Sequence, residues 1–252
     1  MSDHPYETNR YLTEYLLLHY GRPQDICPFT FVPREMLAFH ARIRTECLLP
    51  LPRRAGRMAQ KTRALDLGCG VGRFTFELGR VVDEVIGIDS SKSFVRAARK
   101  MAKTQAITIR VKQSGHDFVS RKLSLPRTLR RSHVLFKAGD ATGSEVFAQE
   151  PFQIVAAINL ICRLPNPRDF LSDLHRLVVP GGQLVVASPF TWMADYSPPS
   201  QWTTAEETQA VLRPHFRLAR RGSLPFLIRE HLRKYQMVIS DVMVFVRQNS
   251  RE

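Results

Sequence analysis

The pattern of apolar and polar residues divides the chain into a helical beginning and a longer, alternating part. In residues 6–20, apolar side chains recur at positions 11, 12, 15, 16 and 18, which is the spacing of an amphipathic helix. Gly21 and Pro23 end this pattern, and a second helix is expected over residues 34–48, followed by a basic linker. We therefore expect residues 1–58 to form an N-terminal helical cap or lid.

From residue 59 to residue 252, short apolar runs alternate with helical patterns. The expected helices cover residues 72–80, 92–103 and 168–177. The expected strands cover residues 64–67, 85–88, 133–137, 154–158, 184–187, 216–219 and 242–246. This alternation predicts an α/β protein with a doubly wound, Rossmann-like and mostly parallel sheet of seven strands. Helices on both faces would explain the continuous apolar runs of the middle strands.

A glycine-rich turn, Asp66-Leu67-Gly68-Cys69-Gly70-Val71-Gly72, directly follows the first expected strand. Glycine has no Cβ, so the backbone can turn tightly and approach a ligand closely. In an open α/β sheet this turn lies at the carboxyl edge of the strands, where ligands bind. Asp89 ends the next strand, 21 residues after Gly68, where a carboxylate can accept hydrogen bonds from two ribose hydroxyls. Position 73 is Arg73 rather than the last glycine of the dinucleotide-binding pattern.

The observed pattern, G-x-G-x-G preceded by Asp66, resembles motif I of the class I S-adenosylmethionine (SAM) methyltransferases. The resemblance implies that SAM is the cofactor and that the three glycines lie against its methionine portion. It also implies that Asp66 helps to hold the ammonium, Asp89 the ribose and Asp140 the adenine amine, with Asn159 facing the methyl group. The full set of implied cofactor residues is Asp66, Gly68, Gly70, Gly72, Arg73, Asp89, Ser90, Asp140, Ala141 and Asn159.

Longer stretches outside these motifs resemble a narrower family, the 5-thiohistidine (4-mercaptohistidine) N-methyltransferases, which usually form the C-terminal domain of ovothiol synthase. The stretches are Tyr6-Glu7-Thr8, Glu14 to Gly21, Asn159 to Pro165, Ser188 to Trp192, Pro225 to His231 and Arg233 to Gln236. The resemblance implies methylation of the imidazole π nitrogen of 5-thiohistidine or of its selenium analogue 5-selenohistidine, the final step of ovothiol- or ovoselenol-type biosynthesis. Because a sulfoxide synthase domain is absent from the sequence, a separate sulfoxide synthase or selenium-inserting enzyme is the expected partner.

The same stretches supply candidates for binding the substrate. Arg163 or Arg229 suits an amino-acid carboxylate, because a guanidinium binds it with two parallel hydrogen bonds. The N-terminal helix and the segment from residue 225 to residue 236 lie outside the common core, so we expect them to close over the opening. The expected substrate-binding residues are Tyr6, Asn9, Tyr15, Arg163, Thr191, Trp192, Phe226 and Arg229.

Catalysis requires little beyond alignment, because a free imidazole titrates near pH 6.5 and its lone pair is available at neutral pH. A proton must leave the product ring, and Glu230, His231 or Tyr235 could receive it directly or through water. The expected catalytic residues are Asn159, Glu230, His231 and Tyr235. A purely structural interpretation stays open for several of them, since Glu230 and Lys234 are also spaced as a helix-stabilising pair.

Charge raises a rival interpretation. The chain has 37 Lys and Arg against 23 Asp and Glu, and residues 91–137 hold 13 of the basic residues with a single acid, Asp117. Within this stretch, residues 104–131 show no clear pattern and are expected to be an irregular basic surface insertion. A basic protein favours anionic partners, so an RNA or DNA methyltransferase and a non-catalytic nucleic-acid-binding protein with a SAM fold are the alternatives. Nucleic acid is nevertheless not the expected substrate, because a base-amine methyltransferase would show Asn/Asp-Pro-Pro-aromatic where this chain has Asn159-Leu160-Ile161-Cys162.

Composition excludes other classes. Apolar residues make up 44% of the chain, enough for a core. The longest nearly apolar run, residues 154–162, is too short to cross a bilayer, and residues 1–10 lack the apolar segment of a signal peptide. The four cysteines form no C-x-x-C pair and no cluster with zinc spacing. We therefore expect a cytoplasmic protein with reduced cysteines, no metal and no membrane partner.

Overall fold

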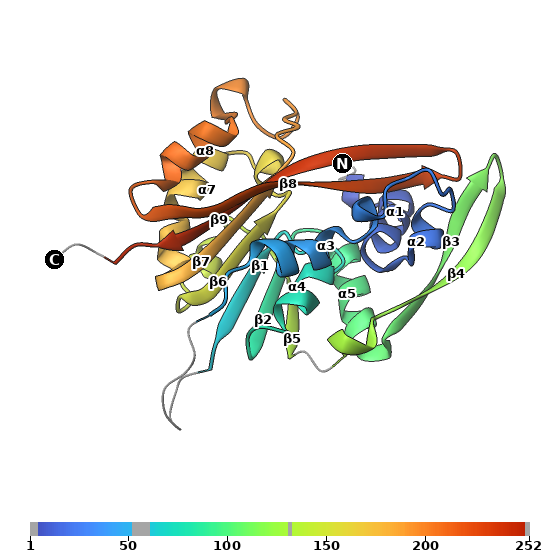
Figure 1. Cartoon of the computed structure of the whole chain (residues 1–252), viewed down its shortest axis with the longest axis horizontal. Helices are drawn as coiled ribbons and strands as arrows, with labels where there is room; N and C mark the ends of the chain where they lie inside the picture. The colour runs from blue at the N-terminus through green and yellow to red at the C-terminus, as the bar shows by residue number, and fades with distance from the viewer. Residues whose placement is uncertain (1–4, 52–60, 131–132, 250–252) are drawn as a thin grey trace.

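The computed structural model describes residues 5–51, 61–130 and 133–249. Its centre is a seven-stranded sheet in the order β5-β2-β1-β6-β7-β9-β8 (Figure 1). Neighbouring strands from β5 to β7 run parallel, and β9 runs antiparallel to both β7 and β8. The strands are β1 (Arg63–Leu67), β2 (Glu84–Asp89), β5 (Val134–Ala138), β6 (Phe152–Ile158), β7 (Val178–Ser188), β8 (Phe216–His231) and β9 (Lys234–Arg247). The predicted Rossmann-like, mostly parallel sheet is confirmed.

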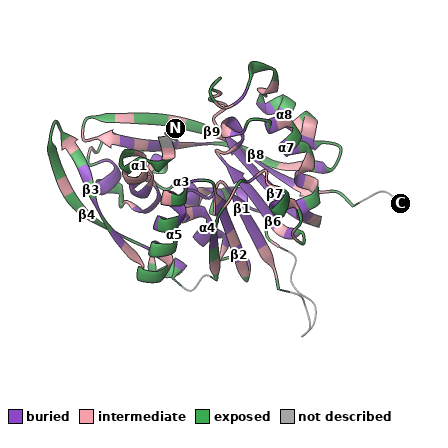
Figure 2. Ribbon diagram, turned by 180° about the vertical axis from the view of Figure 1, so that it is seen from behind, coloured by how far each residue is buried: buried purple, intermediate pink, exposed green. Residues whose placement is uncertain are grey.

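Helices cover both faces of this sheet, as the apolar runs required. Alternation along β1 sends Leu65 and Leu67 toward α7 and α8, while Ala64 packs with α4 on the opposite face. Figure 2 shows the buried residues concentrated along the central strands between these layers. The helices are α4 (Arg73–Leu78), α5 (Lys92–Thr104), α6 (Ser144–Phe147), α7 (Pro167–Asp173) and α8 (Ala205–Leu212), with short 3-10 turns η4 (Arg127–Leu129), η5 (Ile161–Arg163), η6 (Leu174–Leu177) and η7 (Pro199–Gln201).

The N-terminal part is helical but more broken than the sequence pattern predicted. Thr8 caps the first long helix, because its hydroxyl accepts the backbone N–H of Tyr11. The single helix predicted over residues 34–48 is wrong: the chain leaves helical geometry at Ala38, and a π-helical turn follows. The elements are η1 (Pro5–Glu7), α1 (Asn9–Tyr20), α2 (Pro23–Ile26), η2 (Arg34–Leu37), α3 (Phe39–Arg42) and η3 (Ile43–Cys47). The predicted domain boundary at residue 58 lies outside the described residues.

The basic insertion is not irregular. It forms an antiparallel hairpin of β3 (Ala106–Ser114) and β4 (Asp117–Ser124), which is a separate two-stranded sheet. Ile107, Ile109 and Val111 alternate with polar residues along β3 and are buried against the N-terminal helices, whereas the residues between them are exposed. The apolar alternation of a half-buried strand was therefore present in the sequence, but interspersed basic residues obscured it.

Strands β8 and β9 are also much longer than the two late strands expected. Their paired outer halves reach beyond the rest of the sheet and contain the segment that was expected to act as a lid. Glu230 and Lys234 belong to this hairpin rather than to a helix, and their side chains form an ion pair of 2.9 Å across its end. Helices α1 and α2 lie in the corner between the two hairpins and contact both of them (Figure 1). No helix within the described residues is long and apolar enough to cross a membrane.

Candidate functional site

The glycine-rich turn lies at the carboxyl edge of β1 and requires its glycines. Gly68, Gly70 and Gly72 all have positive φ, at 69°, 57° and 93°, a region that residues with a Cβ rarely adopt. A Cβ on Gly68 would stand 2.9 Å from a methyl of Leu160, and one on Gly72 would stand 2.7 Å from the ring of Phe136. Conformation and space therefore both exclude side chains, and the turn leaves bare backbone at the edge of the sheet.

The carboxylate of Asp89 is fixed beside this turn. One oxygen accepts the backbone N–H of Gly70 at 2.8 Å, and the other accepts the N–H of Ser91 at 2.9 Å. Ser90, which lies between Asp89 and Ser91 in the sequence, is exposed. The end of β2 and the glycine turn therefore hold one anionic group in the place where a ribose is expected.

The other two acids differ strongly from each other. Asp66 is buried below the turn, where its carboxylate accepts the hydroxyl of Thr75 at 2.6 Å, and burial raises its pKa to about 7. Asp140 is exposed after β5 and accepts both the N–H and the hydroxyl of Thr142 at 2.8 Å, next to the buried Ala141. Their expected contacts with the ammonium and adenine of the cofactor stay predictions.

Helix α1 lies against the same turn. A Cβ on Gly70 would stand 3.4 Å from Cε1 of His19 and 4.0 Å from Cδ1 of Tyr15. The hydroxyl of Tyr20 donates to the carbonyl of Val71 at 2.7 Å. Sequence reasoning assigned a role to Tyr15 but not to His19 or Tyr20, although the four-residue spacing of Tyr15 and His19 places both on one helix face.

A cluster of tyrosines surrounds a guanidinium near this point. The hydroxyl of Tyr6 accepts Nε of Arg163 at 3.2 Å, and the ring of Tyr6 packs edge-on against Tyr15, with centroids 5.8 Å apart. The guanidinium also lies over the ring of Tyr196, 5.2 Å from its centroid. We call Tyr6, Tyr15, Arg163 and Tyr196 the tyrosine–arginine cluster. Tyr196 was missed because its loop carries no motif.

The electrostatics of this cluster favour hydrogen-bond donation. Burial raises the pKa of Tyr15 well above its ordinary value and that of Tyr196 to about 12, so both phenols stay protonated. Arg163 donates to the carbonyls of Cys162 and Thr191, and within the described residues no acidic side chain pairs with it. The cluster therefore holds a half-buried positive charge that no acidic side chain of the described residues neutralises.

Asn159 occupies a strained position at the end of β6. Its φ is 54°, its backbone N–H donates to the carbonyl of Ala187, and its side-chain oxygen accepts the hydroxyl of Ser240 at 2.7 Å. Asn is among the few residues that tolerate this conformation. The contact with Ser240 links the edge of the parallel strands to β9, and the sequence offered no local signal for it.

The three expected proton acceptors lie elsewhere. Tyr235 is five residues from Ser240 along β9, which is roughly 17 Å at ~3.4 Å per residue. Its hydroxyl donates to the carbonyl of Leu232, while Nδ1 of His231 accepts the N–H of Arg233. Glu230 binds Gln236, Lys234 and Arg10 of α1, and the first two contacts hold its pKa below the ordinary value. The structure does not bring Glu230, His231 and Tyr235 together with Asn159.

The remaining candidates have mainly structural partners. Arg229 is buried on the outer half of β8. It donates to the backbone carbonyl of Asp25 in α2 and to the side chain of Gln113 in β3. Phe226 is buried against Phe39, with ring centroids 4.6 Å apart. Trp192 donates to the carbonyl of Thr203, Thr191 offers its carbonyl to Arg163, and Asn9 is exposed at the start of α1.

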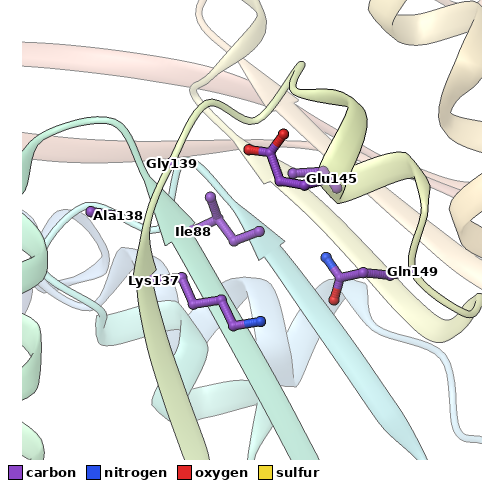
Figure 3. Close-up of a pocket in the computed structure, with 7 residues that line it drawn as sticks. Ile88, Lys137, Ala138, Gly139, Glu145 and Gln149 are labelled. Carbon is purple, nitrogen blue, oxygen red and sulfur yellow. The ribbon is translucent and has the colours of Figure 1, made fainter.

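A shallow pocket of about 150 Å³ lies beside the ends of β2 and β5. In Figure 3, Ile88 and Lys137 lie on neighbouring strands, with Glu145 and Gln149 on the segment beside them. The full lining is Ile88, Lys137, Ala138, Gly139, Glu145, Val146 and Gln149. The pocket shares no residue with the tyrosine–arginine cluster, so the two are separate features.

Comparison with known proteins relates this sequence and fold to methyltransferases. A sequence model of the family described as "Methyltransferase domain" matches residues 38–235. The ubiquinone biosynthesis O-methyltransferase of Maricaulis maris is 25% identical over 126 residues, which are 50% of this chain and 40% of that protein. The chain therefore aligns with less than half the length of this curated relative.

Solved structures show the same fold. The N-methyltransferase NodS of Bradyrhizobium japonicum, in complex with S-adenosylhomocysteine, has a TM-score of 0.52 at 17% identity, covering 96% of this chain and all of that one. The magnesium protoporphyrin IX methyltransferase of Synechocystis, with S-adenosylhomocysteine bound, has a TM-score of 0.55 at 15% identity, covering 97% of each chain. At these identities the likeness shows the fold alone.

Proposed function

The chain belongs to the methyltransferase-domain family and is a class I SAM-dependent methyltransferase, and from this premise we propose that it methylates the imidazole π nitrogen of 5-thiohistidine or 5-selenohistidine. The observation that carries the proposal is the tyrosine–arginine cluster. Three of the stretches that resemble the narrower family contribute Tyr6, Tyr15 and Arg163 to it, although Arg163 is far from the two tyrosines in the sequence.

The cofactor fits the residues at the sheet edge. The glycine turn offers bare backbone where a Cβ would clash, and Asp89 is fixed beside it by two backbone N–H groups. Gly68, Gly70 and Gly72 would hold the amino-acid portion and Asp89 the ribose. When bound, SAM supplies a methyl group on a positively charged sulfur.

The charge of Arg163 matches an amino acid as the acceptor. A half-buried guanidinium that no acidic side chain of the described residues neutralises favours an anionic ligand. Its Nε and Nη1 already donate to Tyr6, Cys162 and Thr191, so Nη2 is the nitrogen that can donate to a carboxylate. The π nitrogen is the ring nitrogen nearest to the amino-acid backbone. A carboxylate anchored at Arg163 therefore restricts which nitrogen reaches the methyl-transfer position, and the rings of Tyr6, Tyr15 and Tyr196 flank the substrate.

Methylation of an imidazole needs alignment rather than a strong base. Positioning of this kind can lower a barrier by about 7–11 kcal/mol in favourable cases. Tyr15 and Tyr196 stay protonated because burial raises their pKa values, so they act as donors and not as bases. The proton that leaves the product ring then passes to water, which agrees with the distant position of Glu230, His231 and Tyr235.

The test is a SAM-dependent assay on 5-thiohistidine, 5-selenohistidine and histidine, with mass spectrometry and NMR to locate the methyl group. We expect π-nitrogen methylation of one or both chalcogen-bearing histidines. 5-Mercaptoimidazole, which lacks the carboxylate, should be a poor substrate for the wild type. Absence of methylation on both chalcogen-bearing histidines, or preferential methylation of RNA in the same assay, would refute the proposed acceptor.

The proposed partners follow from this acceptor. A small thiol- or selenol-bearing histidine is the substrate, and a sulfoxide synthase or selenium-inserting enzyme supplies it. Nucleic acid is not the proposed acceptor, because the groups that surround Arg163 suit one small aromatic amino acid.

A further inference from the structure

His19 of α1 is a buried histidine to which neither the family resemblance nor the proposed acceptor assigns a role. It is 7% exposed, and its ring lies beside the backbone of the glycine turn. A Cβ placed on Gly70 would be 3.4 Å from Cε1 and 3.6 Å from Nε2 of His19. The edge of the ring that carries Nε2 therefore faces the bare backbone that the glycine turn offers to the cofactor.

The hydrogen bonds of His19 fix its tautomer. Nδ1 lies 3.2 Å from the backbone N of Arg73 and accepts its N–H, so Nδ1 carries no proton. Burial, reinforced by His40 and Arg73, holds the pKa of His19 well below its ordinary value, so the ring is neutral. A neutral ring with a bare Nδ1 must carry its proton on Nε2. No hydrogen bond from a described residue reaches Nε2.

Surrounding contacts hold this ring rigidly. The guanidinium of Arg73 donates to the backbone carbonyl of His19 at 2.9 Å and to Glu77 at 2.8 Å, and Arg44 binds the other oxygen of Glu77 at 2.8 Å. The ring of His40 packs against that of His19, with centroids 4.1 Å apart. The position of Nε2–H is therefore set before any ligand binds, which reduces the entropic cost of using it.

We infer that the Nε2–H of His19 donates a hydrogen bond to the carboxylate of the bound cofactor. A neutral imidazole N–H can only donate, so it matches the carboxylate and not the ammonium of the amino-acid end. Asp89 marks the ribose on one side of Gly70, and His19 approaches the same glycine from α1. His19 thus positions the cofactor, and through it the N-terminal helix becomes part of the cofactor site. The inference rests on SAM as cofactor and is independent of the proposed acceptor.

The test compares two ligands that differ only in the carboxylate: S-adenosylhomocysteine and its decarboxylated analogue, both measured by calorimetry without an acceptor. The wild type should prefer S-adenosylhomocysteine by about ten-fold or more, the range of a hydrogen bond to a charged group. His19→Asn keeps an acceptor for the N–H of Arg73 but removes the distal donor. It should bind S-adenosylhomocysteine about ten-fold more weakly and the analogue almost unchanged.

Two variants separate this role from a structural one. His19→Gln places an N–H donor near the position of Nε2 and should recover part of the preference. Tyr20→Phe removes the hydrogen bond to Val71 and should weaken both ligands alike, leaving their ratio unchanged. If His19→Asn weakens both ligands equally, or leaves the preference intact, the inference is wrong.

A measurement on the wild-type protein covers the case in which the His19 variants do not fold. In ¹⁵N-histidine-labelled protein, one imidazole Nε2–H resonance should move on addition of S-adenosylhomocysteine and not on addition of the decarboxylated analogue. If no imidazole N–H distinguishes the two ligands, the inference is overturned. Because no acceptor is present, an inactive acceptor assay would leave this result unaffected.

Discussion

The carboxyl edge of the sheet and the β3–β4 hairpin both carry ionisable side chains, yet they hold them in opposite ways. At the edge, each ionisable side chain is fixed by short contacts: Asp66 by Thr75, Asp89 by two backbone N–H groups and Arg73 by Glu77. On the hairpin, the basic side chains alternate outward into solvent, and within the described residues Arg121 alone forms an ion pair, with Asp25 at 3.4 Å.

This contrast predicts that charge density is a poor guide to the functional site of this protein. The basic stretch dominates the net charge of the chain, but nearly all of its described cations are exposed, and Arg121 is the one that forms an ion pair within the described residues. Surface charges of this kind contribute little to stability, about 0–1 kcal/mol even when paired. The few charges at the edge are held by partners in a low-dielectric environment, where each contact has a larger effect. Four predictions test this difference.

Asp66 should give the largest effect on stability. Burial raises its pKa to about 7 from the ordinary value of 3.8, so the folded state holds a proton that the unfolded state has released between these pH values. Stability contributed by this proton is present below about pH 4 and is lost as pH rises toward 7. The full shift corresponds to roughly 4 kcal/mol.

Urea unfolding between pH 4 and pH 8 measures this dependence. Asp66→Asn cannot ionise but can still accept the Thr75 hydroxyl, so its unfolding free energy should lack the decline seen in the wild type. Groups that titrate in both proteins cancel in the difference. A parallel pH dependence in the two proteins would mean that Asp66 is ionised in the folded state at all these pH values.

The glycine turn and Asp89 should give the largest effect on cofactor affinity. Gly70→Val forces a branched side chain into positive φ beside His19, and Asp89→Ala leaves two backbone N–H groups without their acceptor. We expect SAM to bind at least about 100-fold more weakly to each variant, which is about 3 kcal/mol. Gly222→Ala, on β8 with open space around it, is the matched control. Calorimetry that finds all three variants equal to wild type would contradict the assignment of the cofactor site.

The core was predictable because its signals are local. The apolar run at residues 154–158 predicts a strand from five consecutive positions. The glycine-rich turn that ends at Gly72 likewise predicts the edge of the sheet where a ligand binds. The tertiary contacts gave no such signal. Tyr196 reaches Arg163 from a loop, and Ser240 meets Asn159 from a distant strand. Spacing also misled: Glu230 and Lys234 are four residues apart, as on a helix, but they face each other across the end of a hairpin.

Arg163 should govern recognition of the acceptor with a smaller effect. Arg163→Met keeps much of the side-chain volume but removes the cation within the tyrosine–arginine cluster. We expect the KM for 5-thiohistidine or 5-selenohistidine to rise about ten-fold, or about 1.4 kcal/mol, with SAM affinity within about two-fold of wild type. Arg229→Met is the informative comparison, because Arg229 is the other candidate for the carboxylate. In the structure it donates to the carbonyl of Asp25 in α2 and to the side chain of Gln113 in β3. If Arg229→Met raises the KM and Arg163→Met does not, the carboxylate binds at the other guanidinium.

The outer face of the β3–β4 hairpin should give the smallest effect. Arg110, Lys112 and Lys122 are exposed there, opposite the apolar face that packs on the N-terminal helices. Reversing all three charges to Glu should leave kcat and KM for the small acceptor within about two-fold, because at 0.15 M salt exposed charges are screened within about 8 Å.

Arg121→Ala changes the opposite, inward side of β4 and should lower stability slightly, by less than about 1 kcal/mol. Any weak RNA affinity of the wild type should fall in the triple variant, and its salt dependence should become shallower. Steady-state kinetics and thermal unfolding on the same samples separate these effects. A folded triple variant with strongly reduced turnover would show that the basic face takes part in the reaction, and the contrast between the two regions would then no longer hold.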